Sequence, residues 1–216
     1  MENKYFLFVK FGRREHMERL LKDGELYLNS TTFFSQYDES NGVGDKYEGV
    51  YLVDNPPFCD IELKFNSPDI KDLKLEKVKG IHMRIRENEP QGNIFCLNMA
   101  NGVREENERV GRIELNASLL DLGADYDTAV VIFDYKKFLE RVTTELEKLP
   151  YFYKFSPVKY YDEKLCQGEE HTFFHKREKY SEQNEFRIYV ETNSDSPLRI
   201  HIGNMEDIAF LKELPR

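Results

Sequence analysis

A glutamate and an arginine near the C-terminal end of the chain, Glu185 and Arg187, have the residue types and the spacing of a ligand-binding pair. The run from Gln183 to Val190 alternates polar and apolar side chains, a pattern typical of a β-strand. Every second residue from Gln183 to Tyr189 then shares one face with the pair, and the apolar residues between them face the core. A carboxylate and a guanidinium on one strand face can hold a polar ligand between them. The alternative is a strand face whose charges are simply covered by water.

The region between residues 37 and 48 carries two glycines and a cluster of acids: Asp38, Glu39, Asp45 and Glu48. Hard divalent cations bind clustered oxygens, so a metal site is one interpretation, although the spacing matches no EF-hand loop. A loop that folds over a ligand is another, with Tyr37 or Tyr47 stacking on that ligand. Solvated acids without a ligand are the third interpretation.

His171 and His175 are four residues apart, which puts both imidazoles on one face if the segment is helical. The sequence shows no third ligand beside them, and the Phe173-Phe174 pair between them suggests packing. We therefore expect packed histidines, and no metal enters the predicted site.

The composition limits the class of partner. The chain has 216 residues, with 40 acidic and 31 basic side chains and a net charge of −9. This balance argues against broad binding of a phosphate backbone, which requires an extended basic surface. A local basic patch that binds a few phosphates is still compatible with this balance, and it would consist of Arg84, Arg86, Arg104 and Arg112.

Three cysteines, Cys59, Cys96 and Cys166, are widely spaced and form no CxxC pair. Such a set fits a reducing compartment better than a disulfide framework or a zinc site. Cys96 lies in an apolar run, where we expect a small buried side chain without a lowered pKa. The chain opens without a basic and apolar leader, and no apolar run approaches the roughly 18–20 residues that cross a bilayer. We expect a soluble, cytoplasmic protein with no membrane partner.

The first elements of the chain are expected to be a strand, a helix and a strand. Residues 5–11 form an aromatic run typical of a strand, and residues 13–22 carry apolar side chains at helical spacing. Gly24 is suited to end this helix because glycine readily adopts the left-handed conformation found there. Residues 25–30 form a short second strand, and Ser30 or Thr31 can cap a helix that follows.

The second half of the chain contains a clear strand and helix pair. Residues 128–133 form the most apolar strand, and Asp134 is placed to cap a helix that runs to about residue 149. A short tail helix is expected over residues 205–211. Further strands are expected at residues 93–99, 183–190 and 198–203.

Many short strands with two or three helices predict an α+β fold with a split, mostly antiparallel β-sheet. We expect a single domain over residues 1–216. Within it, residues 54–112 are expected to form an insertion, a lid or simply more sheet.

Short segments near both ends of the chain carry a resemblance to a known family. At the N-terminal end these are Val9-Lys10-Phe11, Lys22-Asp23-Gly24 and Leu26-Tyr27-Leu28-Asn29, with Ser30-Thr31-Thr32 after them. Near the C-terminal end, Gln183-Asn184-Glu185 opens a late strand. This order resembles ADP-ribosyltransferase-fold proteins, in which a Gln-x-Glu motif opens a late strand and a Ser-Thr-Ser strand occurs earlier. The layout looks like that of the bacterial toxin and defence members of the family.

The resemblance implies that NAD is the cofactor and that a macromolecule accepts ADP-ribose. Cleavage of the nicotinamide–ribose bond builds up positive charge on the ribose, which Glu185 would stabilise while Gln183 orients the acceptor. The cofactor-binding residues implied are Lys10 or Arg13 for the diphosphate, Tyr27, Phe34 or Tyr47 for stacking on nicotinamide, and Ser30, Thr31 and Arg187 beside them. Loss of the Glu185 carboxylate is expected to abolish modification and to leave thermal stability nearly unchanged.

Three classes of function stay open. The first is an intracellular ADP-ribosyltransferase that modifies nucleic acid or protein as a toxin or phage-defence effector, with an antitoxin or other regulatory protein as its partner. The second is a binding or regulatory module of the same fold without catalysis. The third is a metal-dependent nuclease or hydrolase built on Asp38, Asp45, Glu48 and the two histidines. Thermal stabilisation by NAD favours the first class, and stabilisation by magnesium or manganese favours the third.

Overall fold

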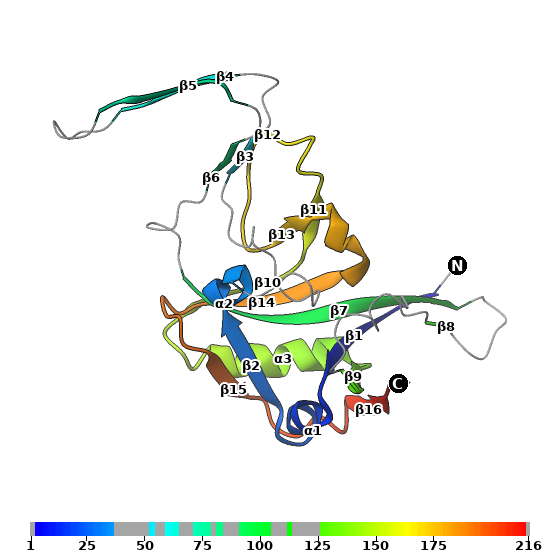
Figure 1. The fold of residues 1–216 in the computed structure, drawn as a ribbon. Coiled ribbons are helices and arrows are strands. Elements are labelled where there is room, and N and C mark those ends of the chain that lie inside the picture. Colours follow the sequence, from blue (N-terminus) through cyan, green and yellow to red (C-terminus); the bar gives the residue numbers. More distant parts are fainter. Residues whose placement is uncertain are drawn as a thin grey trace.

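The computed structural model describes residues 3–36, 52–54, 59–64, 71–78, 81–83, 91–104, 112–113 and 126–214. Its largest element is a nine-stranded antiparallel sheet (Figure 1). The main path across this sheet runs through β10 (Phe152–Pro157), β14 (Glu185–Glu191), β7 (Asn93–Arg104), β1 (Asn3–Gly12), β9 (Thr128–Ile132) and β16 (Ala209–Glu213). Three strands attach to this path: β2 (Glu25–Ser30), β8 (Arg112–Ile113) and β15 (Leu198–His201). The expected α+β class, with a mostly antiparallel sheet and few helices, is confirmed.

The sheet is split along one edge of its central strand, β7. β1 pairs with this edge from Asn98 to Arg104, whereas β2 joins it only at Asn93 and Ile94. Among the described strands, none pairs with this edge over residues 95–97, while β14 covers the opposite edge along the same length. The gap between β1 and β2 therefore leaves backbone groups of β7 available to side chains.

Two helices contribute to a hydrophobic core on one face of the sheet, α1 (Arg14–Asp23) and α3 (Tyr135–Leu146) (Figure 1). The buried stripe of α3 consists of Phe138, Val142 and Leu146, at the spacing that places them on one side of a helix. Asp134 caps α3 as expected, because its carboxylate accepts a hydrogen bond of 3.0 Å from the backbone N–H of Lys137. The expected helix ends three residues early, at Leu146 rather than at residue 149.

The expected tail helix over residues 205–211 is wrong. The chain makes a turn after Met205 and then forms β16, which pairs with β9 from Ala209 to Glu213. Short apolar runs do not distinguish helix from strand by their periodicity. Here β9 offers a row of backbone hydrogen-bonding groups at the sheet edge, and β16 satisfies them.

Three smaller sheets complete the described structure. A three-stranded sheet contains β12 (Gln167–Glu170), β3 (Leu52–Asp54) and β6 (Ile81–Met83), and a parallel pair contains β11 (Lys159–Tyr161) and β13 (His175–Arg177). A hairpin of β4 (Cys59–Leu63) and β5 (Leu73–Val78) extends away from the main sheet (Figure 1). Residues 54–112 thus include both this projecting hairpin and the central strand β7. No helix in the described part of the chain has the length and apolar character needed to cross a membrane.

Gly24, at the end of α1, and Gly203, which follows β15 and lies beside it, form a matched pair of glycines for a stability test. Gly24 has φ +61°, and a Cβ atom there would lie 2.2 Å from the carbonyl oxygen of Gly203. Gly203 also has a positive φ, +79°, but a Cβ atom there would meet no atom within 4 Å. We expect Gly203→Ala to lower the free energy of unfolding by about 1–2 kcal/mol through backbone strain alone. Gly24→Ala should cost about 2–5 kcal/mol, since a backbone clash is added, and urea denaturation of both variants measures the difference.

Candidate functional site

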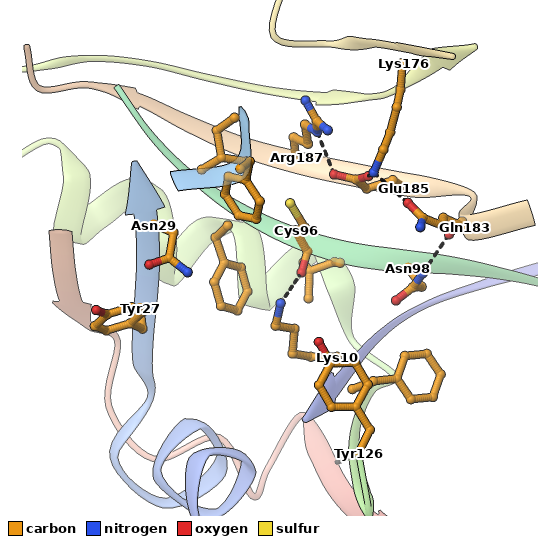
Figure 2. Close-up of a pocket in the computed structure, with 15 residues that line it drawn as sticks. Lys10, Tyr27, Asn29, Cys96, Asn98, Tyr126, Lys176, Gln183, Glu185 and Arg187 are labelled. Carbon is orange, nitrogen blue, oxygen red and sulfur yellow. Dashed lines mark hydrogen bonds and ion pairs between the residues drawn. The ribbon is translucent and has the colours of Figure 1, made fainter. Parts of the chain in front are cut away.

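A pocket of about 180 Å³ occupies the gap where β1 and β2 separate along β7 (Figure 2). Its floor is residues 95–97 of β7, where the edge facing β1 and β2 has no partner among the described strands. Its sides come from β1, β2, the start of β14 and the segment before β14. The lining residues are Lys10, Phe11, Tyr27, Asn29, Phe34, Ile94, Phe95, Cys96, Leu97, Asn98, Tyr126, Lys176, Gln183, Glu185 and Arg187. The split in the sheet is therefore what creates the site.

Glu185 is held in this pocket by two cations. Its Oε2 atom lies 2.9 Å from Nζ of Lys176, and its Oε1 atom lies 2.5 Å from Nε of Arg187 (Figure 2). Lys176 also donates a hydrogen bond of 2.7 Å to Oε1 of Gln183. Burial by itself would raise the pKa of Glu185, but the charges of Arg187 and Lys176 outweigh burial and hold the pKa well below its ordinary value. The carboxylate is therefore ionised at neutral pH.

The interpretation of this strand face as solvated is wrong. Glu185 is 4% exposed and Arg187 is 2% exposed, although both belong to the polar set of the alternating pattern. The alternation itself is confirmed, because Phe186, Ile188 and Val190 lie in the core on the other face. Both faces of β14 are buried, since the segment from β11 to β13 lies over the face that would otherwise meet water.

The backbone around Glu185 is fixed by hydrogen bonds from three directions. The N–H of Glu185 donates to the hydroxyl oxygen of Tyr160 at 2.8 Å, and its carbonyl accepts from the N–H of Val158 at 2.8 Å. Asn184 has φ +39°, a left-handed conformation that asparagine tolerates, and its side-chain amide donates to the carbonyl of Met99 at 2.6 Å. The strand therefore starts at Glu185 rather than at Gln183, which ends a 3₁₀ helix spanning Glu178–Gln183.

Lys10 enters the pocket from the end of β1. Its Nζ atom donates a hydrogen bond of 2.8 Å to the carbonyl oxygen of Cys96, on the unpaired stretch of β7, and lies 4.8 Å from the ring centre of Phe95. Burial lowers the pKa of Lys10, and the nearby groups Cys96 and Glu185 oppose this effect only in part. An anionic ligand beside Lys10 would stabilise its charged form.

The pocket contains more positive than negative charge. Lys10, Lys176 and Arg187 line it together with a single carboxylate, that of Glu185. The whole chain carries a net charge of −9, so this local excess of cations is opposite to the global balance. Aromatic rings of Tyr27 and Phe34 lie at the same site. Cations beside aromatic faces suit a ligand that has both an anionic group and a flat ring.

Cys96 is half-buried in the pocket and is not a nucleophile in this environment. Burial, together with the negative charge of Glu185, raises the pKa of the Cys96 thiol to about 12. The thiol therefore stays protonated at neutral pH, in line with the expectation of a cysteine without a lowered pKa.

The structure brings together six of the ten residues expected from the sequence: Lys10, Tyr27, Phe34, Gln183, Glu185 and Arg187. Arg13 is exposed where α1 begins and does not line the pocket. Ser30 and Thr31 are buried outside it, and the Ser30 hydroxyl instead caps α2 (Thr31–Gln36) by accepting a hydrogen bond of 3.1 Å from the N–H of Phe33. Tyr47 lies outside the described residues.

The sequence interpretation missed Lys176, which contacts both residues of the expected catalytic pair. The available signal was the basic dipeptide Lys176-Arg177 shortly before Gln183-Asn184-Glu185. The sequence interpretation also missed the polar groups of Asn29 and Asn98. These two side chains line the pocket only because the sheet is split there, and the split has no signature in the local sequence.

The metal interpretations gain no support from the described residues. His171 and His175 are not on a helix, and their rings meet edge to face at 5.0 Å, with Tyr161 packed on His171 at 4.1 Å. Within the described ranges, no group of three or more His, Cys, Asp or Glu side chains is arranged to hold a metal ion. Asp38, Asp45 and Glu48 lie outside those ranges.

Lys10 provides the first test of ligand binding at this pocket. We expect Lys10→Met to weaken binding of an anionic nucleotide about tenfold or more, because a charge-assisted hydrogen bond is lost. Only the protonated amine attracts the anion, so the affinity of the natural protein should fall as pH rises through the lowered pKa of Lys10. Thermal shifts over a titration with NAD measure both effects. Lys136→Met, on the exposed side of α3, is the matched control and should bind as the natural protein does.

The pocket thus combines a buried, ionised carboxylate, three cations and aromatic faces at the split of an antiparallel sheet. Its geometry is the basis for assigning a function. In comparisons of this chain with protein-family models, with curated proteins and with solved structures, no match is found.

Proposed function

We propose that this protein is an NAD-dependent ADP-ribosyltransferase that modifies a macromolecule, with Glu185 as the catalytic carboxylate. The observation that carries the proposal is the position of Glu185, which opens the late strand β14 and lines the same pocket as Lys10 and Tyr27 of the first two strands. The expected family layout requires this arrangement of a late-strand glutamate opposite the first strand. An outward-facing Glu185 with no pocket beside it would have ruled the proposal out.

The chemical character of the pocket supports NAD as the ligand. Lys10 suits the phosphate next to the nicotinamide riboside, and Tyr27 and Phe34 suit the flat nicotinamide ring. A volume of about 180 Å³ is smaller than the roughly 300–1,000 Å³ of sites that enclose a drug-sized ligand. The described pocket therefore suits one end of a dinucleotide, and we assign it to the nicotinamide riboside end.

The residues of the pocket have distinct roles in this proposal. When bound, NAD would supply the ADP-ribosyl group: the bond from ribose C1′ to nicotinamide would break with its electron pair leaving on nicotinamide. The nucleophilic atom of the acceptor would form the new bond to C1′ and release its proton to water. Glu185 stabilises the positive charge that develops on the ribose, because its fixed negative charge lies in a buried site where water screens it little. Gln183 orients the acceptor nucleophile. Lys176 fixes the positions of the Gln183 and Glu185 side chains through its two hydrogen bonds. Arg187 keeps the carboxylate ionised.

The biological setting is also proposed, on the resemblance to toxin and defence members of the fold. In this setting the protein acts in the cytoplasm on nucleic acid or protein, and an antitoxin or other regulatory protein restrains it. The acidic net charge of −9 favours an acceptor that is recognised at the pocket rather than along an extended basic surface.

Transfer of label from NAD tests the proposal directly. The purified protein is incubated with NAD labelled in its adenylate part and with whole-cell extract, and the product is then digested separately with protease and with nuclease. We expect label in a macromolecular fraction, and the digestion that releases it identifies the acceptor class. Absence of transfer, together with no thermal stabilisation by NAD, would contradict the proposal.

A second candidate is a binding module of the same fold without catalysis, and one observation favours it. Both carboxylate oxygens of Glu185 are engaged by cations, Oε1 by Arg187 and Oε2 by Lys176. A carboxylate neutralised on both sides is a weaker stabiliser of a developing positive charge. Thermal stabilisation by NAD without any transfer of label would favour this second function.

A further inference from the structure

Three amide side chains line the pocket, those of Asn29, Asn98 and Gln183. The amide of Asn98 donates a hydrogen bond of 2.7 Å to the backbone carbonyl of Gln183, and the side-chain oxygen of Gln183 accepts one of 2.7 Å from Lys176. Asn29 differs from both, because its side chain makes no hydrogen bond to any residue that the structure describes. Its amide therefore has donors and an acceptor available to a ligand.

The pairing register places Asn29 and Glu185 on one face of the sheet. Asn29 is paired with Ile94 of β7, and Glu185 is paired with Asn98 on the opposite edge of the same strand. Residues 94 and 98 are an even number apart, so their side chains point to one face, and directly paired residues share that face. Four residues along β7 correspond to about 13 Å. This span accommodates one base and its ribose between the two side chains.

The aromatic rings assigned to nicotinamide lie at the same end of the pocket as Asn29. Tyr27 precedes Asn29 by two residues on β2 and points to the same face, whereas the leucines that alternate with them are buried in the core. Phe34 follows on α2, which begins directly after β2. Figure 2 shows Tyr27 and Asn29 on β2, across the pocket from Glu185. A base whose ribose faces Glu185 therefore extends toward Asn29.

We propose that Asn29 binds the carboxamide of the nicotinamide ring and makes the pocket selective for NAD over the analogue that has a carboxylate in place of this carboxamide. In this arrangement Nδ2–H of Asn29 donates to the carboxamide oxygen, and Oδ1 of Asn29 accepts from the carboxamide N–H. The inference rests on the proposed function, because it takes NAD as the ligand. It adds a residue that determines which dinucleotide the site accepts.

Nicotinic acid adenine dinucleotide is the matched probe, because it differs from NAD only at this group. Its carboxylate has no N–H to donate, so Oδ1 of Asn29 would face a second acceptor and one hydrogen bond would be lost. The excess of positive charge in the pocket acts in the opposite direction, since it attracts the additional negative charge of the analogue. A preference for NAD therefore distinguishes recognition of the amide from general electrostatic attraction.

Isothermal titration calorimetry of the full chain with each dinucleotide tests the inference. We expect the natural protein to bind NAD about tenfold more tightly than the analogue. Asn29→Leu keeps a side chain of similar size but removes both kinds of hydrogen-bonding group, so NAD should bind about tenfold more weakly and the preference should disappear. His201→Leu is the matched control, because His201 is exposed on β15, on the same sheet face but outside the pocket. This control should leave both affinities unchanged.

Three results with NAD bound would overturn the inference: equal affinity of the natural protein for both dinucleotides, an Asn29→Leu variant that keeps the preference, or a His201→Leu variant that loses it. Transfer of label from NAD by the natural protein would then show that the proposed function stands without this role for Asn29. If neither dinucleotide binds and no label is transferred, the inference and the proposed function fail together. The comparison of the two ligands on the natural protein decides the question even if Asn29→Leu does not fold.

Discussion

Under the proposed function, Glu185→Gln is expected to lower the rate of ADP-ribosyl transfer by on the order of a hundredfold or more. The amide has the shape of the carboxylate but lacks the negative charge, so the electrostatic stabilisation of the ribose is lost while the shape of the pocket is kept. Single-turnover transfer of label from NAD to extract is the measurement. Binding of NAD, followed by thermal shift, should change far less than the rate, because Lys10, Tyr27 and Phe34 are untouched.

The control for this experiment must separate loss of chemistry from loss of fold. Leu146→Ala truncates a fully buried side chain of α3 outside the pocket and should cost about 2–5 kcal/mol of stability. At a temperature where both variants are folded, Leu146→Ala should keep nearly full activity. A Glu185→Gln variant with the activity of the natural protein would remove Glu185 from the catalytic role. Such a result, with transfer still present, would leave the enzyme in place and require a different catalytic residue.

The same substitution is expected to destabilise the fold by about 3–5 kcal/mol, which replaces the sequence-based expectation of unchanged thermal stability. The reason is that Lys176 and Arg187 would remain buried without a counter-charge, at 4% and 2% exposed. Urea denaturation of the natural protein and of Glu185→Gln measures the loss. Adding Lys176→Met to Glu185→Gln should recover part of the lost stability, because one of the two buried cations without a counter-charge is then removed.

The pH dependence gives an independent check on this second prediction. The pKa of Glu185 is lowered in the folded protein from the ordinary value of 4.5, so the folded state binds its proton less readily than the unfolded state. The stability contributed by the carboxylate is therefore fully present above about pH 5 and decreases as pH falls below the unfolded value. The difference in unfolding free energy between the natural protein and Glu185→Gln should be constant near neutral pH and should shrink below pH 4.5. A difference that does not change with pH would show that the ion pairs do not control this stability.

Local patterns of the sequence predicted a large part of the fold. The alternation over residues 183–190 correctly separated the core side of β14 from the polar side that carries Glu185 and Arg187. Gly24 and Asp134 correctly marked a helix end and a helix start. These features depend on one strand or one turn, so neighbouring residues are sufficient to specify them.

Other features depended on contacts between distant segments. The polar face of β14 was expected to be either solvated or ligand-binding, and it is buried because residues 158–177 lie over it. Lys176 reaches Glu185 by this route, and Lys10 reaches Cys96 across a separation of 86 residues. The tail formed β16 instead of a helix because the edge of β9 offered hydrogen-bonding groups.

The chain's own periodicity and turn residues were sufficient to establish which residue types face the core and that Glu185 lies in a late strand. That this strand begins at Glu185 rather than at Gln183 was decided by the tertiary structure. The tertiary structure decided the charge state of that carboxylate, the cations that hold it and the side chains around it. These depend on the split of the sheet at β7 and on the segment that covers β14. The reason is physical: side-chain direction is set by backbone geometry within a few residues, whereas burial and electrostatic environment are set by segments far apart in sequence.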